Sequence, residues 1–170
     1  MIKTHSYGLS IFFDADGVIA EYERDAYEGM HPKFCNEHQH YFRYCKRDDC
    51  AYALLLQFIE YGADVWILSK ADAQYPWIKH DKIQWFQDHI PEIPLEKIII
   101  AKSDKAETIK VKKKLKKLTK NMILIDDYNN NLQDWIDEGG IGIKYINGIN
   151  NPNSFNGPKI YRSAIPSKIR

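Results

Sequence analysis

Residues 10–19 read SIFFDADGVI, so that a short apolar run passes straight into Asp14, Asp16 and Gly17. The run predicts a buried strand, and a strand places residues i and i+2 on the same side. The two carboxylates are therefore expected to converge, and they repel each other unless a cation or a shared proton offsets their charge. Asp-Gly is also a common turn pair, so this stretch alone leaves ordinary loop chemistry open.

The composition is that of one globular domain. Of 170 residues, 44% are hydrophobic and 28% are charged, which is enough to bury a sizeable core. No apolar run approaches the roughly 20 residues that cross a membrane, and the first ten residues lack the apolar core of a secretory signal. We therefore expect a single soluble, cytoplasmic domain over residues 1–170. The net charge of +1 gives no global electrostatic case for a nucleic-acid partner.

Strands and helices are expected to alternate along the chain. This order predicts an α/β fold of Rossmann-like type, a parallel sheet with helices on both faces. Residues 18–47 are rich in aromatic and charged residues but lack a long apolar period, so we expect a small cap inserted after the first strand. The predicted strands are 10–13, 64–69, 96–101, 121–127 and 141–146, and the predicted helices are 48–62, 77–91, 103–119 and 129–140.

Polar side chains follow four of the predicted strands. Parallel sheets bind ligands beyond the carboxyl ends of their strands, so side chains from these ends are expected to meet. A set that combines carboxylates, a hydroxyl and an ammonium group is far less expected by chance than any one member. The strand ends carry Asp14 and Asp16, then Ser69, then Lys102 and Lys105, and finally Asp126 and Asp127.

This set suits the hydrolysis of a phosphate monoester, which needs a nucleophile, positive charge on the phosphate oxygens and a proton for the leaving oxygen. Asp14 can attack phosphorus to give an aspartyl-phosphate intermediate. Asp16 can protonate the departing alcohol and then activate water. Ser69 and Lys105 can hold the phosphate oxygens, with Lys102 as the alternative lysine. We prefer Lys105 because it opens a helix.

Magnesium is the expected cofactor, since it prefers oxygen ligands and retains several waters. The candidate ligands are Asp14, Asp16 with a backbone carbonyl near it, Asp126 and Asp127. Which of Asp126 and Asp127 contacts the ion directly stays open at this point.

Four segments, DADGV, VWILS, AKSDKAE and LIDD, resemble in this order the four motifs of the haloacid dehalogenase-like (HAD) hydrolases. Within that superfamily, DADGVIAEYE with VWILS and LIDDYNNNLQDW is similar to the small 5'(3')-deoxyribonucleotidases of bacteria and phages. The resemblance implies a magnesium-dependent phosphatase acting on nucleoside monophosphates. The cap is shorter than in the well-known deoxyribonucleotidases, so another small phosphate ester or a phosphorylated nucleic-acid end stays open as the substrate.

Several further residues have two interpretations. Tyr41, Phe42 and Arg43 in the cap can contact a base and a phosphate, or they can pack the cap onto the sheet. The lysine run at 110–120 is read as a solvated amphipathic helix, and a non-catalytic nucleic-acid-binding protein is the alternative from another functional class. Lys70, Lys79 and Lys82 are expected to border the site without assigned roles.

The cysteines and histidines between residues 31 and 50 could in principle ligate zinc. Their spacings match no zinc-finger pattern, so we expect reduced cysteines with a structural role. The residues concerned are His31, Cys35, His38, His40, Cys45 and Cys50.

Overall fold

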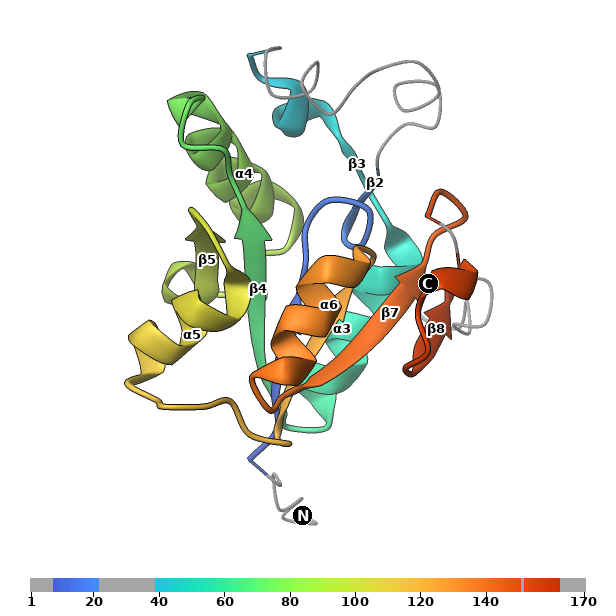
Figure 1. Cartoon of the computed structure of the whole chain (residues 1–170). Coiled ribbons are helices and arrows are strands. Elements are labelled where there is room, and N and C mark those ends of the chain that lie inside the picture. The colour runs from blue at the N-terminus through green and yellow to red at the C-terminus, as the bar shows by residue number, and fades with distance from the viewer. Residues whose placement is uncertain (1–7, 22–38, 151, 163–170) are drawn as a thin grey trace, which may run out of the picture.

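The computed structural model describes residues 8–21, 39–150 and 152–162. In this part of the chain, a six-stranded parallel sheet has the order β5-β4-β1-β6-β7-β8 (Figure 1). The predicted α/β fold with a parallel sheet is confirmed, and β8 is an edge strand that the sequence did not predict. The strands are β1 (Ser10–Phe13), β4 (Asp64–Lys70), β5 (Ile98–Ala101), β6 (Met122–Asp126), β7 (Ile141–Ile146) and β8 (Lys159–Tyr161).

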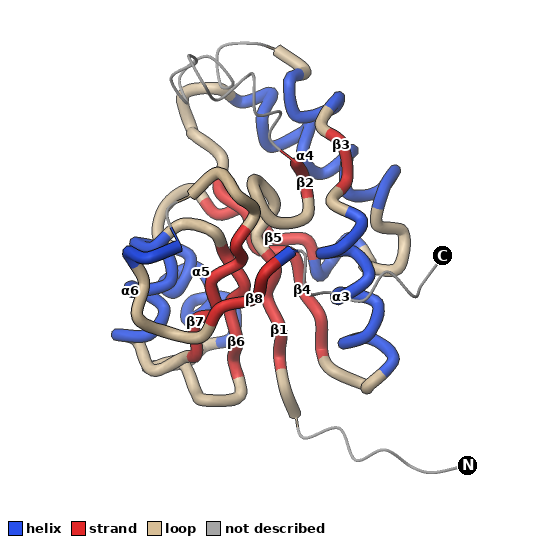
Figure 2. Tube along the Cα trace, turned by 90° about the vertical axis from the view of Figure 1, so that its right-hand side faces the viewer, coloured by secondary structure: helices blue, strands red, loops and turns tan. Residues whose placement is uncertain are grey.

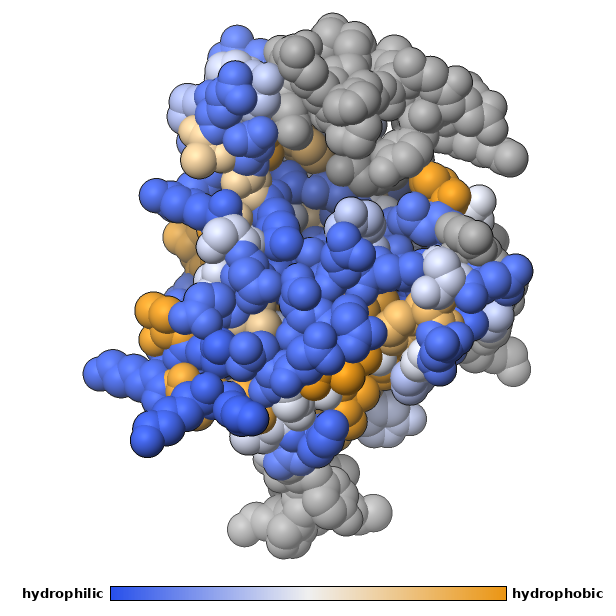
Figure 3. All heavy atoms as spheres, viewed as in Figure 1, coloured by the Kyte–Doolittle hydropathy of each residue, from blue (hydrophilic) through white to orange (hydrophobic). Residues whose placement is uncertain are grey.

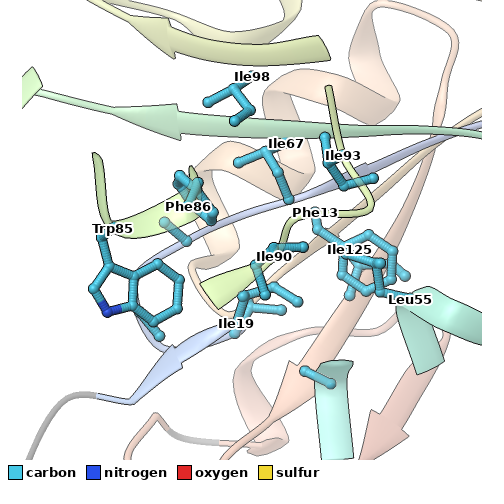
Figure 4. Packing of buried hydrophobic residues seen from close by; sticks show 14 of the residues in the cluster. Phe13, Ile19, Leu55, Ile67, Trp85, Phe86, Ile90, Ile93, Ile98 and Ile125 are labelled. Carbon is cyan, nitrogen blue, oxygen red and sulfur yellow. The ribbon is translucent and has the colours of Figure 1, made fainter. Parts of the chain in front are cut away.

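Helices cover both faces of the sheet. On one face lie α3 (Asp49–Glu60) and α4 (Pro76–His89), and on the other lie α5 (Lys105–Lys113) and α6 (Asn129–Asp137). Because side chains alternate along a strand, β1 sends Ile11 and Phe13 into the first of these cores and Phe12 into the second. Figure 4 shows the first core, where Phe13 and neighbouring strand residues meet side chains of α3 and α4.

Side-chain caps begin α3 and α5. Asp48 accepts hydrogen bonds from the backbone N–H groups of Cys50 (2.9 Å) and Ala51 (3.0 Å) at the start of α3. Asp104 accepts one from the N–H of Glu107 (2.6 Å) at the start of α5. Such caps satisfy donors that a helix leaves unpaired at its first turn.

The predicted length of α5 was wrong, because the helix ends at Lys113 and not near Thr119. Lys114 adopts a left-handed conformation with φ of 54°. Beyond it, Leu118 is buried in the second core, and its N–H donates to the carbonyl of Glu138 at 2.9 Å. The packing of Leu118 therefore outweighs the helical propensity of the lysine run in this segment. Hydrophilic residues cover most of the face formed by α5 and α6 (Figure 3).

The described part of the predicted cap lies beyond the carboxyl end of β1 (Figure 1). It contains β2 (Ala20–Glu21) paired antiparallel with β3 (Lys46–Arg47), and the 3₁₀ helix η1 (Tyr41–Tyr44), which packs on α4. Figure 2 shows β2 and β3 near α4. Residues 22–38, with His31, Cys35 and His38, lie outside the described residues, so the extent of the cap stays a prediction.

Short elements complete the described chain. The 3₁₀ helices η2 (Leu95–Lys97) and η3 (Pro152–Ser154) precede β5 and β8. Cys45 and Cys50 are free thiols. Across residues 8–21, 39–150 and 152–162, no helix combines the length and the apolar character needed to cross a membrane.

Candidate active site

Three carboxylates meet at the carboxyl edge of the sheet. Phe13 of β1 pairs with Ile125 of β6, so Asp14 and Asp126 leave the two strands side by side. The N–H of Asp14 donates to the carbonyl of Ile125 at 2.9 Å, which fixes this register. With Asp127, the two aspartates offer oxygens that all lie within 4.8 Å of one another, and all three residues are buried. The sheet register therefore brings these predicted site residues together.

Lys105 lies between two of these carboxylates. Its Nζ is 2.6 Å from Asp14 Oδ1 and 2.6 Å from Asp126 Oδ2, and the residue is only 2% exposed. Lys102, the alternative lysine, is exposed to solvent. The structure therefore places Lys105 in the site and Lys102 outside it.

Asp126 and Asp127 are held differently. Both oxygens of Asp126 accept hydrogen bonds, Oδ1 from the N–H of Tyr128 (2.8 Å) and Oδ2 from Lys105 and from Asn131 Nδ2 (3.0 Å). The Oδ2 atom of Asp127 accepts hydrogen bonds from Asn147 Nδ2 (3.0 Å) and from Asn150 Nδ2. Asp127 also lines the cavity of the site. Asp127 is therefore better placed than Asp126 to contact a bound ion.

Gly17 makes room for this arrangement. Its φ is +76°, and a Cβ at this position would lie 2.2 Å from Asp127 Oδ2. Its carbonyl accepts a hydrogen bond from Asn147 Nδ2 at 2.8 Å. A side chain at residue 17 would meet both backbone strain and a steric clash, so the glycine after the two aspartates is required by the site.

The site holds more negative charge than Lys105 offsets. Burial, with a further contribution from Asp126, raises the pKa of Asp14 to about 7 despite Lys105. Burial and the nearby carboxylate of Asp126 raise the pKa of Asp127 well above its ordinary value. Burial acts to lower the pKa of Lys105, but the carboxylates of Asp126 and Asp14 outweigh it and raise that pKa. Crowded, buried carboxylates of this kind fit a divalent cation with oxygen ligands.

Asp16 and Ser69 meet at a different lysine. Ser69 is fully buried at the end of β4, and its Oγ accepts a hydrogen bond from Lys82 Nζ at 3.1 Å. The carboxylate of Asp16 also contacts Lys82 Nζ and lies outside the three-carboxylate group. Lys82 was expected only to border the site. Its spacing from Ile78 and Trp85 on the buried face of α4 is the signal that could have identified it.

A cavity of about 170 Å³ opens onto the carboxylates of Asp14, Asp16 and Asp127, and the predicted residue Ser69 is not among the described residues that line it. Lys70 lies on its wall, with Nζ 2.7 Å from Asn131 Oδ1. Sequence reasoning missed Asn131, and it missed Asn150 on another wall. The lining residues are Asp14, Asp16, Lys70, Lys105, Asp127, Tyr128, Asn131 and Asn150.

The cap residues Tyr41, Phe42 and Arg43 are not among the described residues that line this cavity. Phe42 is 5% exposed and packs in the first core, and Tyr41 contacts it edge to face at 5.3 Å. Arg43 lies 3.9 Å from Asp88 of α4. This arrangement favours a packing role for Phe42, and the substrate contacts of all three residues stay a prediction.

Known proteins share this fold at low sequence identity. No protein-family model matches the sequence, and no curated protein matches it either. A HAD-superfamily hydrolase from Ehrlichia chaffeensis aligns with a TM-score of 0.49 and 14% identity, over 91% of this chain and 92% of that one. A HAD hydrolase, family IA, variant 3, from Entamoeba histolytica HM-1:IMSS aligns with a TM-score of 0.62 and 13% identity, over 90% of this chain and 92% of that one. The chain therefore has a fold similar to that of the Entamoeba HAD hydrolase.

Proposed function

We propose that this protein is a magnesium-dependent phosphatase that hydrolyses phosphate monoesters through an aspartyl-phosphate intermediate on Asp14. The observation that carries the proposal is the buried group of Asp14, Asp126 and Asp127, with Lys105 between two of its members. A nucleophile, a buried cation and a metal-binding oxygen set at one sheet edge are the parts that phosphoryl transfer requires.

Asp14 is the nucleophile in this proposal. Its Oδ1 is held by the N–H of Ala15 (2.7 Å) and by Lys105, so we assign the attack to Oδ2. The bond from Oδ2 to phosphorus forms as the ester P–O bond breaks, and the departing oxygen takes a proton from Asp16. Asp16 then accepts a proton from the water that attacks the aspartyl-phosphate, which releases phosphate and restores Asp14.

The other side chains hold the ion and the phosphate. We assign direct magnesium contacts to Asp14 and Asp127 together with the backbone carbonyl of Asp16, while Asp126 orients Lys105. When bound, magnesium neutralises charge on the phosphate oxygens. Lys105, which opens α5 and lines the cavity, and the hydroxyl of Ser69, near the end of β4, are assigned to the phosphate oxygens.

A nucleoside monophosphate is the substrate class that we favour. The cavity of about 170 Å³ suits the phosphate end of a ligand whose remaining part lies at the cavity mouth. Tyr128 lines the cavity and is 54% exposed, so a planar base has an aromatic face available there. The resemblance to 5'(3')-deoxyribonucleotidases points to the same class.

Phosphate release from a panel of esters tests the proposal. The panel contains an aryl phosphate, a sugar phosphate, 5'- and 3'-deoxyribonucleotides and a 5'-phosphorylated oligonucleotide, each with magnesium and with a chelator. We expect magnesium-dependent turnover that is highest for the mononucleotides. Turnover that survives the chelator would contradict the metal assignment. Faster turnover of another ester would show that nucleoside monophosphates are not the preferred substrate class.

We predict that Tyr128→Ala weakens turnover of a mononucleotide much more than turnover of acetyl phosphate. Base stacking on an aromatic side chain is worth about 1–3 kcal/mol, or roughly 5- to 150-fold in kcat/KM. Tyr61→Ala, which removes a 72% exposed tyrosine beyond α3, is the matched control and should leave both substrates unchanged. If Tyr128→Ala lowered kcat/KM by the same factor for both substrates, the ring would have a structural role and would not contact the base.

We predict that magnesium raises the melting temperature, and more so at neutral than at acidic pH. Without a cation, burial raises the pKa of Asp14 from 3.8 to about 7, so the native state keeps a proton that the unfolded chain has released. Stability then falls as the pH rises between these two values, and magnesium offsets this loss. At 100 times its dissociation constant, the ion adds about 2.7 kcal/mol, or about 5–11 °C in a domain of this size.

Thermal melts at pH 5 and pH 7.5, with magnesium or a chelator, check this prediction. Asp137→Asn, a surface substitution on α6, is the control and should keep the full shift. A shift of the same size at both pH values would contradict the charge argument.

A further inference from the structure

A second buried lysine, Lys82, lies next to the site but has no role in the mechanism above. It is on α4 and is 3% exposed. Its Nζ donates to Ser69 Oγ at 3.1 Å, to the carbonyl of Lys70 at 2.7 Å and to Asp16 Oδ2. An ammonium group has three N–H donors, so these three contacts satisfy all of them. The geometry therefore fixes Lys82 with respect to two side chains of the proposed mechanism.

Phe42 of the cap closes the remaining side of Lys82. The ring centroid lies 4.4 Å from Lys82 Nζ, within the range of a cation–π contact. The space that these residues enclose with Asp16, Trp85 and neighbouring side chains is about 10 Å³, at the lower limit for one water molecule. Lys82 is thus held from two sides, by the strand ends and by the cap.

We propose that Lys82 is a positioning residue that fixes the carboxylate of Asp16 and the hydroxyl of Ser69 relative to each other, and that Phe42 keeps it in place. The catalytic consequence rests on the proposed function: Asp16 protonates the leaving oxygen only if its carboxyl group is held beside the ester bond. A buried ammonium group is retained only when it is paired, so Lys82 and Asp16 depend on each other. The cap thereby controls the position of the general acid through one side chain.

The first test measures coupling in the folded protein and needs no activity. Urea unfolding midpoints are compared for Lys82→Met, Asp16→Asn and the double variant, with Lys82→Gln as a second replacement if Lys82→Met does not fold. We expect both single variants to unfold at lower urea, and the double variant no earlier than Lys82→Met. Effects that simply add would overturn the proposal. Lys79→Met, on the exposed face of α4, is the matched control and should leave the midpoint unchanged.

The second test uses the leaving group. An alkyl phosphate needs a proton on its departing oxygen, whereas p-nitrophenyl phosphate releases the p-nitrophenolate anion without one. Because both esters share the hydrolysis of the aspartyl-phosphate, release of the leaving group is measured in a single turnover. We expect Lys82→Met to slow alcohol release from the alkyl phosphate by about 10²–10⁴-fold and p-nitrophenolate release by less than about 10-fold, with partial recovery in Lys82→Arg. An equal fall in the single-turnover release rates of both esters would overturn the role of Lys82 in positioning Asp16. If the parent protein hydrolyses no ester, the proposed function fails, while the unfolding experiment still decides whether Lys82 positions Asp16.

Discussion

Replacing Asp14 by Asn is expected to abolish phosphate release while the protein keeps its fold. The amide cannot form the bond to phosphorus, and it contributes no charge toward a cation shared with Asp127. We expect a fall of more than about 10⁴-fold, beyond the roughly 10²–10⁴-fold that loss of a general acid alone gives. Steady-state kinetics on an aryl phosphate measure this fall, and circular dichroism checks the fold.

Two other variants serve as comparisons for Asp14→Asn. Asp16→Asn should leave slow but measurable turnover, because it removes proton transfer and leaves the nucleophile. Asp137→Asn should behave like the parent, since this residue is exposed on α6. Turnover at the parental rate in Asp14→Asn would remove the aspartyl-phosphate mechanism altogether.

Replacing Lys105 by Met is expected to give the largest loss of stability. Lys105 is buried with Nζ 2.6 Å from both Asp14 and Asp126, and its removal leaves two buried carboxylates without their cation. Breaking a buried ion pair in this way costs about 3–5 kcal/mol. In a domain of this size, that corresponds to a fall of about 6–20 °C in the melting temperature. Thermal melts in a chelator measure the loss, and magnesium should restore part of it.

Lys102→Met is the matched control for this substitution. Lys102 precedes the same helix but is exposed, so its replacement should change the melting temperature and the turnover very little. If Lys102→Met were the more damaging of the two, the assignment of the phosphate lysine would be reversed.

The sequence predicts the parts of the site that follow directly from strand ends. Once a parallel sheet is inferred, Asp14, Ser69 and Asp126 must emerge at the same edge, because each directly follows or closes an apolar run. Lys105 could be preferred over Lys102 because Asp104 marks the start of the helix that follows the strand, and Lys105 is the first residue of that helix. These predictions need only the local periodicity of the sequence and the rule that parallel sheets bind ligands beyond the carboxyl ends of their strands.

The remaining parts depend on contacts that no local pattern encodes. Asn147 and Asn150 reach Asp127 from the segment after β7, and the sequence shows them only as polar residues of a loop. Lys82 appears as one of several lysines on a helix until the structure shows its ammonium group buried beside Asp16. The early end of α5 likewise depends on where Leu118 packs. Each of these features is determined by tertiary packing, which overrides local propensity.

The hydrogen bond from Asn147 to Gly17 joins residues 130 positions apart in the chain. Such long-range contacts carry a large entropic cost, because a long loop must close before they contribute. β1 is made before Asn147, yet Asp127 in the carboxylate group receives its hydrogen bond from Asn147 only when Asn147 has been made and has docked. A fragment that ends before Asn147 would carry DADGV, VWILS, AKSDKAE and LIDD but would lack the hydrogen bonds that hold Gly17 and Asp127 at the proposed magnesium site. If the proposed site binds magnesium, its affinity is therefore expected to depend on the assembled chain and not on the four motifs alone.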